Sequence, residues 1–323
     1  MPNLTIAVIG PEGYASQLGK KGTTSDITFY NAKKDQNTVT YIEPSRYPER
    51  VSSLFYAVST ADMALLVVDE MTPAFGESVV MLDMVGVERG VVVCRNYLSR
   101  EEVLRVVKGT VVERFAFEAD DPVHLRERFL AAAKEASHGG AKGAGVRCGA
   151  VAVDHHFPVK GVGTVALGGV VEGTIRVHND LRVLPTEKVA HVRSIQTHDD
   201  DVSEASRGDR VGLALKGIEA EELDRGYVLS NDPSLEVSRV ISGRAELVRY
   251  WKAPLREGMI VHLGHWMQFV PARIAFVDSS GDWRRPVVTL RADRELVHPR
   301  DGRIIIHYLE GERLRVVGGI VPR

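Results

Sequence analysis

The stretch at residues 152–175, AVDHHFPVKGVGTVALGGVVEGTI, decides the fold class. Its valines alternate with small or polar residues, and glycines interrupt the run, which is typical of β-strands separated by turns. Short valine-rich runs of this kind recur from Val146 onward at intervals of roughly 8–12 residues, the pattern of a β-barrel or sandwich. A second β-rich block follows Pro233. The second half of the chain is therefore predicted to be all β.

The first 120 residues follow a different pattern, in which strands and helices alternate. The apolar run LTIAVIG at residues 4–10 predicts a buried strand that ends in a turn. Apolar residues at i, i+3, i+4 and i+7 between Val51 and Val58 predict an amphipathic helix. This alternation indicates a doubly wound α/β domain.

The predicted organisation is therefore α/β plus all-β, with one doubly wound domain followed by two small β-barrels. The α/β domain covers residues 1–120. A helix and a linker that contains GGAKGAG occupy residues 121–145. The first barrel covers residues 146–232 and the second covers residues 233–323.

Composition indicates a cytoplasmic protein. The 323 residues are 44% hydrophobic and 26% charged, with a formal net charge of -2. No apolar run reaches the 18 residues of a membrane span, and the first residues lead straight into a strand without a charged leader. Cys94 and Cys148 are too few for a disulfide framework or a cysteine-based zinc site, which fits a reducing compartment.

Positive charge is concentrated at the end of the chain. Residues 231–323 carry 15 Lys+Arg against 11 Asp+Glu, and all but one of these basic residues are arginines. Because arginine binds phosphate in a bidentate fork and stacks on bases, this bias indicates RNA binding. Solvated charge on a stable barrel is the alternative explanation.

Three motifs of the first barrel occur in the order and near the spacing found in a known family. They are residues 152–175, VRSIQTHDDDV at 192–202 and RGDRVGLALKGIEAEELDRGYVL at 207–229. With them the chain resembles the translational GTPases of the elongation factor Tu family, and most of all the selenocysteine-specific, SelB-like elongation factors. The resemblance covers essentially the whole chain and implies a GTPase-like α/β domain before two barrels.

The phosphate loop departs from the pattern of that family. A loop of the form G-x-x-x-x-G-K-[ST] brings backbone N–H groups, a lysine and a hydroxyl to the phosphates and Mg²⁺. Residues 10–17 read GPEGYASQ, which keeps Gly10 but places Ala15, Ser16 and Gln17 at the three later positions. Most of the first switch loop is also missing.

Two further nucleotide motifs are altered. Where the family has Asp-x-Pro-Gly-His, residues 43–47 read EPSRY, so Glu43, Arg46 and Tyr47 replace the aspartate, the glycine and the catalytic histidine. Where the family has Asn-Lys-x-Asp for guanine, Asn96 is kept and Ser99 stands at the aspartate, which a helix cap also explains. We therefore expect a degenerate GTPase without activity that holds no nucleotide cofactor.

A second candidate site lies in the first barrel. In the selenocysteine factors a pocket there holds the aminoacyl group, and its motif positions correspond to Asp154, His155 and Arg210 in this chain. Asp154 and Arg210 match, whereas His155 replaces an arginine. The alternative is a structural ion pair between Asp154 and Arg210 that His155 covers. No metal site is expected, since paired histidines such as His262 and His265 have no evident third ligand.

The leading functional hypothesis is an elongation-factor-like protein that has lost GTP binding and hydrolysis and binds tRNA or the ribosome. One alternative is a protein-interaction or oligomeric scaffold without RNA. A second alternative is a GTPase with an unorthodox phosphate loop. Neither a membrane nor DNA is expected as a partner, and the oligomeric state is left open.

Overall fold

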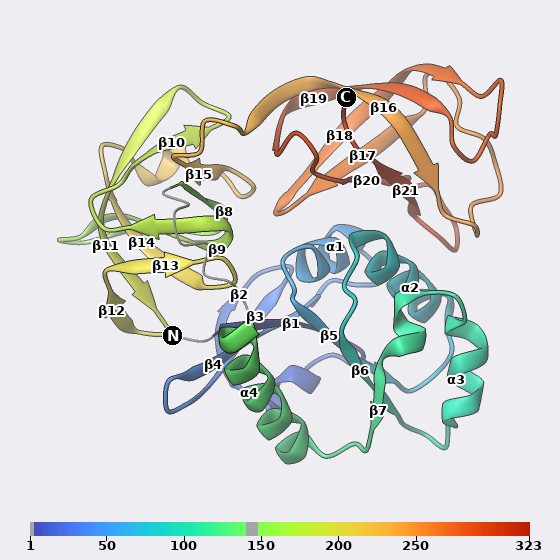
Figure 1. Cartoon of the computed structure of the whole chain (residues 1–323), viewed down its shortest axis with the longest axis horizontal. Helices are drawn as coiled ribbons and strands as arrows, with labels where there is room; N and C mark the ends of the chain where they lie inside the picture. Colours follow the sequence, from blue (N-terminus) through green and yellow to red (C-terminus); the bar gives the residue numbers. More distant parts are fainter. Residues whose placement is uncertain (1–2, 140–147) are drawn as a thin grey trace.

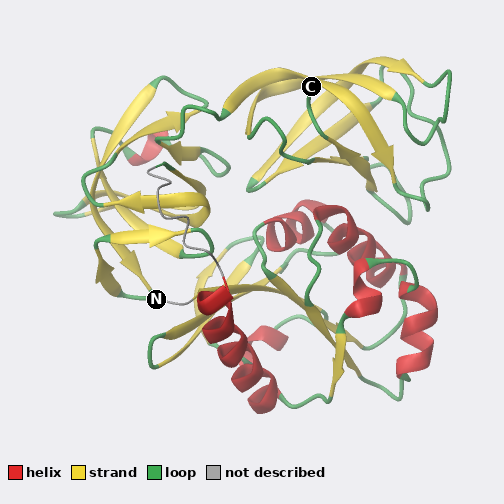
Figure 2. Ribbon diagram, viewed as in Figure 1, coloured by secondary structure: helices red, strands yellow, loops and turns green. Residues whose placement is uncertain are grey.

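The computed structural model describes residues 3–139 and 148–323 as an α/β domain followed by two β-barrels (Figure 1). This arrangement confirms the predicted fold class. The α-helices all lie in the α/β domain, and the barrels consist of strands and loops with one short 3₁₀ helix (Figure 2). The predicted linker GGAKGAG lies outside the described residues except for Gly139.

A single seven-stranded sheet forms the centre of the α/β domain, in the order β2-β3-β4-β1-β5-β6-β7. The strands β4, β1, β5, β6 and β7 run parallel, whereas β2 and β3 are antiparallel to their neighbours. The hairpin between β3 and β4 places an antiparallel edge on a doubly wound sheet. The strands are β1 (Asn3–Ile9), β2 (Lys20–Thr24), β3 (Thr28–Lys34), β4 (Asn37–Glu43), β5 (Met63–Val68), β6 (Gly90–Cys94) and β7 (Ala116–Glu118).

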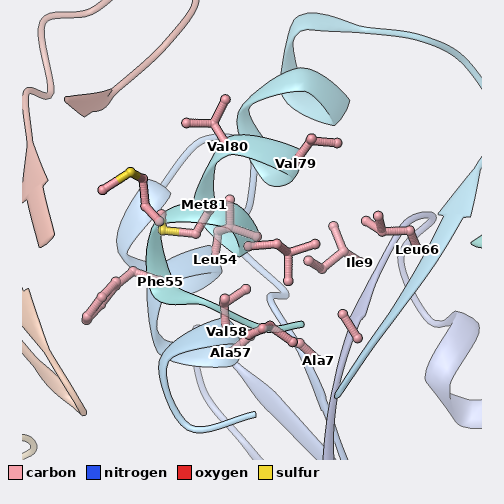
Figure 3. Close-up of a cluster of buried hydrophobic side chains, with 14 of the residues drawn as sticks. Ala7, Ile9, Leu54, Phe55, Ala57, Val58, Leu66, Val79, Val80 and Met81 are labelled. Atoms are coloured by element: carbon pink, nitrogen blue, oxygen red, sulfur yellow. The ribbon is translucent and has the colours of Figure 1, made fainter. Parts of the chain in front are cut away.

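The two faces of this sheet are covered unequally. Helices α1 (Val51–Ser59), α2 (Pro73–Val85) and α3 (Arg100–Val107), with the 3₁₀ helix η2 (Val111–Arg114), pack on one face. Figure 3 shows Leu54 of α1 beside Ile9 of β1 in this core, while Phe55 of the same helix points away from the sheet. The other face is covered by α4 (Pro122–Gly139) and the 3₁₀ helix η1 (Tyr14–Gln17).

The first barrel is a closed ring of six strands in the order β10-β15-β8-β9-β14-β11, because β10 also pairs with β11. Two short strands extend it, since β12 pairs with β11 and β13 pairs with β9. The alternation of valine and glycine in residues 152–175 corresponds to β8 and β9. The elements are β8 (Gly149–Val159), β9 (Gly163–Arg176), β10 (Asp180–Leu184), β11 (Lys188–Thr197), β12 (Asp200–Val202), β13 (Glu204–Ser206), β14 (Arg210–Lys216), η3 (Ala220–Glu222) and β15 (Val228–Ser230).

The second barrel is closed in the order β16-β19-β18-β17-β20-β21. Its inward-facing residues form a separate aliphatic core, so each barrel buries its own apolar face. The strands are β16 (Glu236–Leu247), β17 (Ile260–His265), β18 (Gln268–Asp278), β19 (Val287–His298), β20 (Ile304–His307) and β21 (Val316–Ile320).

The second barrel is docked on the side of the α/β domain that carries α1 and α2 (Figure 1). Phe55 of α1 packs against Phe269 and His307, with ring centroids 5.9 and 5.2 Å apart. Beside this aromatic contact, the carboxylate of Glu77 accepts hydrogen bonds from the backbone N of Arg315 at 2.6 Å and from its Nε at 3.1 Å. Glu77 is only 2% exposed, so the ion pair is removed from water.

No helix among the described residues is long and apolar enough to cross a membrane.

The Glu77–Arg315 pair generates a stability prediction. Arg315→Met leaves the Glu77 carboxylate buried without its cation, which we expect to cost about 3–5 kcal/mol of unfolding free energy. Arg285→Met is the matched control, because Arg285 pairs with Glu246 on the surface, where such a pair contributes at most about 1 kcal/mol. Urea unfolding measures both variants, and equal losses would contradict the importance of the interdomain pair.

Candidate functional site

The loop that follows β1 occupies the place where a nucleotide-binding protein cradles phosphates. Gly10, the residue after β1, is retained. A Cβ at this position would lie 2.7 Å from the Cβ of Val67 in β5, so the close approach of the chain to β5 requires glycine here. Gly13 has a φ of 81°, in the left-handed region that favours glycine. The loop then enters the four-residue 3₁₀ helix η1 rather than a full α-helix.

A carboxylate of the protein itself fills this loop. Glu43, at the end of β4, accepts hydrogen bonds from the backbone N–H groups of Gly13 and Ala15, the latter at 3.1 Å. Its side chain is buried, and this burial raises the pKa of Glu43 although the two hydrogen bonds act in the opposite direction. Backbone donors of the kind that hold a phosphate oxygen are therefore bonded to an internal carboxylate.

The remaining residues of the altered nucleotide motifs are spread over different environments. Ser16 and Gln17 are exposed on η1, and Arg46 is exposed in the turn after β4. The hydroxyl of Tyr47 donates to the carbonyl of Ala74 at 2.6 Å, at the start of α2. The Arg315 guanidinium of the second barrel lies over the Tyr47 ring, 5.8 Å from its centroid, so Tyr47 belongs to the contact between these two domains.

The predicted cap at Ser99 is confirmed. Its Oγ accepts from the backbone N of Glu102 at 3.3 Å, while the Glu102 carboxylate accepts from the backbone N of Ser99 at 2.8 Å, which completes a capping box for α3. Asn96 lies three residues earlier, in a turn with a φ of 50°.

An ion-pair network lies at the carboxyl ends of β5, β6 and β7, beside this turn. Arg95 Nε is 3.1 Å from Asp120 Oδ2 and 3.5 Å from Asp69 Oδ1. The hydroxyl of Tyr14 donates to Asp120 Oδ1 at 2.7 Å, so η1 is joined to the same network. The motif comparison did not identify Arg95, Asp120 or Tyr14, because their contacts connect loops far apart in the sequence.

The three residues predicted for the pocket of the first barrel do lie together. Asp154 is 4% exposed, and its Oδ1 is 2.7 Å from both Arg210 Nη2 and His155 Nδ1. The Arg210 guanidinium stacks over the ring of Phe29, 3.7 Å from its centroid. Since Phe29 belongs to β3, the cluster forms part of the contact between the first barrel and the α/β domain.

Arg225 strengthens the same contact, although sequence reasoning did not identify it. Its guanidinium bonds the carboxylate of Asp26 and donates to Ser25 Oγ at 2.9 Å, and its Nε donates to the carbonyl of Asp154 at 3.2 Å. Burial disfavours a charged Asp26, but Arg225 holds the pKa of Asp26 below its ordinary value. The signal was present in the motif at 207–229, which contains Arg225.

A cavity of about 120 Å³ lies where the three domains meet. Its lining includes Phe29 and Asp62 of the α/β domain, Asp154 and Arg210 of the first barrel and Trp266 of the second. Arg210 Nε is buried and has no hydrogen-bond partner among the described residues. The cavity therefore offers a cationic donor to a small polar group. Within residues 3–139 and 148–323, no group of three or more potential ligands that could hold a metal ion is present.

Comparison with known proteins places the chain in a family. Residues 163–230 match the model of elongation factor Tu domain 2. An uncharacterized protein of Methanocaldococcus jannaschii is 41% identical over 259 residues, which cover 80% of this chain and 82% of that protein. The chain belongs to one family with this M. jannaschii protein, and its first barrel is similar to elongation factor Tu domain 2.

The selenocysteine-specific elongation factor of M. jannaschii is 28% identical over 295 residues. The match covers 83% of this chain and 61% of that factor. The crystal structure of the elongation factor SelB from Methanococcus maripaludis in its apo form superposes with a TM-score of 0.80 at 23% identity. That superposition covers 99% of this chain and 79% of SelB, and it establishes a shared fold.

The raised pKa of Glu43 generates a pH prediction. A folded pKa above the unfolded value means that stability is greatest below the unfolded pKa, about 4.3, and falls as pH rises through the folded pKa. Glu43→Gln, which cannot ionise, should therefore gain stability relative to wild type as pH rises above about 4.3.

Glu102→Gln is the control of opposite sign, because hydrogen bonds from Ser99 lower the pKa of Glu102. This variant should lose stability relative to wild type as pH rises toward the unfolded pKa, about 4.3, and the difference should stay constant above that pH. Urea unfolding at several pH values measures both differences, and a Glu43→Gln difference that does not change with pH would contradict the prediction.

Proposed function

We propose that this chain is an elongation-factor-like RNA-binding protein of translation that neither binds GTP tightly nor hydrolyses it. The observation that carries the proposal is the Glu43 carboxylate on the backbone donors of Gly13 and Ala15. A phosphate would have to displace this carboxylate or approach it closely, and like charges at short distance repel.

Several further features support the loss of nucleotide binding. Ser16 and Gln17 supply neither the ammonium group of a phosphate-loop lysine nor the hydroxyl group that binds Mg²⁺. The 3₁₀ helix η1 has four residues, so the loop has no long helix whose dipole would attract an anion. Ser99, at the position of the guanine-binding aspartate, caps α3 instead.

RNA binding is supported by the outer face of the second barrel. Arg273 and Arg291 are direct cross-strand neighbours on β18 and β19, and both are exposed. Neither has an acidic partner within 4 Å among the described residues. Because like charges directly opposite each other destabilise a sheet, an anion that binds between them is favoured. Val240, Ile260 and Phe276 extend this face with exposed apolar side chains.

A role for Asp154, His155 and Arg210 in holding an aminoacyl group forms part of this proposal. The cavity beside Arg210 and the unpartnered Nε support it. Arg210→Ala is a poor test, because it leaves the buried Asp154 carboxylate without its cation at a cost of about 3–5 kcal/mol. Two alternatives remain, a protein scaffold without RNA and a GTPase with an unorthodox phosphate loop. The experiments below distinguish both from this proposal.

The first experiment measures nucleotide binding. We expect calorimetry with GTP or GDP and Mg²⁺ to detect no affinity tighter than about 1 mM, which corresponds to about -4.1 kcal/mol. The scattering profile of the protein should also be unchanged by GTP, because a ligand without differential affinity cannot shift a domain arrangement. Stoichiometric micromolar binding would favour the unorthodox GTPase.

The second experiment measures RNA binding. tRNA should bind with an affinity that falls steeply with salt, since each neutralised phosphate releases counterions. Arg273→Gln/Arg291→Gln should weaken binding at least tenfold, because each charge-assisted contact contributes about 1.5–3 kcal/mol. Arg285→Gln/Arg300→Gln is the matched control, since both arginines are already paired with glutamates on the same barrel. No binding of tRNA or ribosomes at low salt would favour the scaffold.

A further inference from the structure

A second basic site lies in a groove of the α/β domain, away from the loop that Glu43 fills. The groove has a volume of about 410 Å³, within the range of ligand-binding pockets. Its walls are the segment from Ser16 to Lys20, the end of β3 and the helix α4. The groove lies on the face of the sheet against which η1 and α4 pack.

Four cations and one carboxylate line the groove, but two of the cations are already paired. Lys33 bonds Asp200 of β12, and Lys34 bonds Glu127 of α4. Lys20 and Arg126 have no acidic partner within 4 Å among the described residues. The groove therefore keeps two uncompensated positive charges that face the same space.

The positions of these two cations suit a phosphate-bearing ligand. Arg126 is half-buried on α4, so its guanidinium is partly ordered before any ligand arrives, and this group binds phosphate oxygens through two parallel hydrogen bonds. Lys20 lies on the opposite wall, at the start of β2, and the amide of Asn31 lies beside it because the two residues are paired in the sheet.

The lining also indicates which part of a nucleic acid would be recognised. The residues that line the groove include no aromatic side chain, so a base has no surface on which to stack. Sequence-independent contact with the sugar-phosphate backbone requires only cations and polar donors. The Lys33–Asp200 pair joins the wall of the groove to β12 of the first barrel.

We propose that the groove between α4 and the Ser16–Lys20 segment binds phosphate groups of an RNA strand through Lys20 and Arg126. This inference rests on the proposed RNA-binding function and adds a contact site in the α/β domain to the one on the second barrel. Free polyphosphate offers the same phosphate oxygens, and the experiment below distinguishes it from RNA as the ligand.

The experiment compares fluorescein-labelled twelve-residue oligouridylate and inorganic tripolyphosphate as probes of the full chain. Lys20→Gln/Arg126→Gln should weaken RNA binding at least tenfold at low salt and make the salt slope shallower by about 1.4 for two single-strand phosphates. Arg105→Gln/Lys108→Gln makes the same charge change at exposed Arg105 of α3 and at Lys108, the residue that follows this helix, and should bind within about twofold of wild type. Unfolding midpoints establish that all variants are folded.

The outcomes separate this inference from the function on which it rests. RNA binding that Arg273→Gln/Arg291→Gln weakens and Lys20→Gln/Arg126→Gln does not would overturn the groove and leave the proposed function standing. Tripolyphosphate binding that requires Lys20 and Arg126, without any RNA binding, would overturn both the RNA assignment and the proposed function while leaving an anion site. Failure of both probes to bind would overturn the groove altogether.

Discussion

The buried ion pair between Glu77 and Arg315 determines how the second barrel is seated on the α/β domain. Two elements that are 238 residues apart in sequence meet there, and the carboxylate is satisfied by the main chain and the side chain of the same arginine. The ion pair between Arg225 and Asp26 does the same for the first barrel, whose Arg210 also stacks on Phe29. Charges that are removed from water tolerate little displacement, so these two contacts define the position of both barrels and of the cavity between them.

The architecture could be predicted from the sequence because it depends on short-range patterns. The change from helical spacing around Val51 to valine and glycine alternation after Asp154 separates the α/β domain from the barrels. The cap at Ser99 was equally predictable, since both partners lie within one turn of helix. The grouping of Asp154 with Arg210 came from the family resemblance, which carries three-dimensional information that spacing alone lacks.

The contacts that give the candidate sites their character could not be predicted in this way. The contact of Glu43 with Gly13 and Ala15 depends on a left-handed glycine that turns two N–H groups toward β4, and periodicity does not encode that geometry. Arg225 was hidden inside a recognised motif because its partners, Ser25 and Asp26, lie in another domain. The groove beside Arg126 exists because η1 has only four residues and covers little of the sheet. Its other wall is α4, and the sequence does not show where α4 packs.

The carboxylate of Glu43 is part of the chain, whereas a bound ligand can dissociate. A bound molecule occupies its site to an extent set by its concentration and its dissociation constant, so its stabilising effect varies with the surroundings. Glu43 is tethered to the donors of Gly13 and Ala15 by the chain itself, so this contact does not depend on the supply of a separate molecule. The contact therefore forms without any solute, and its contribution to the stability of the α/β domain needs no bound ligand.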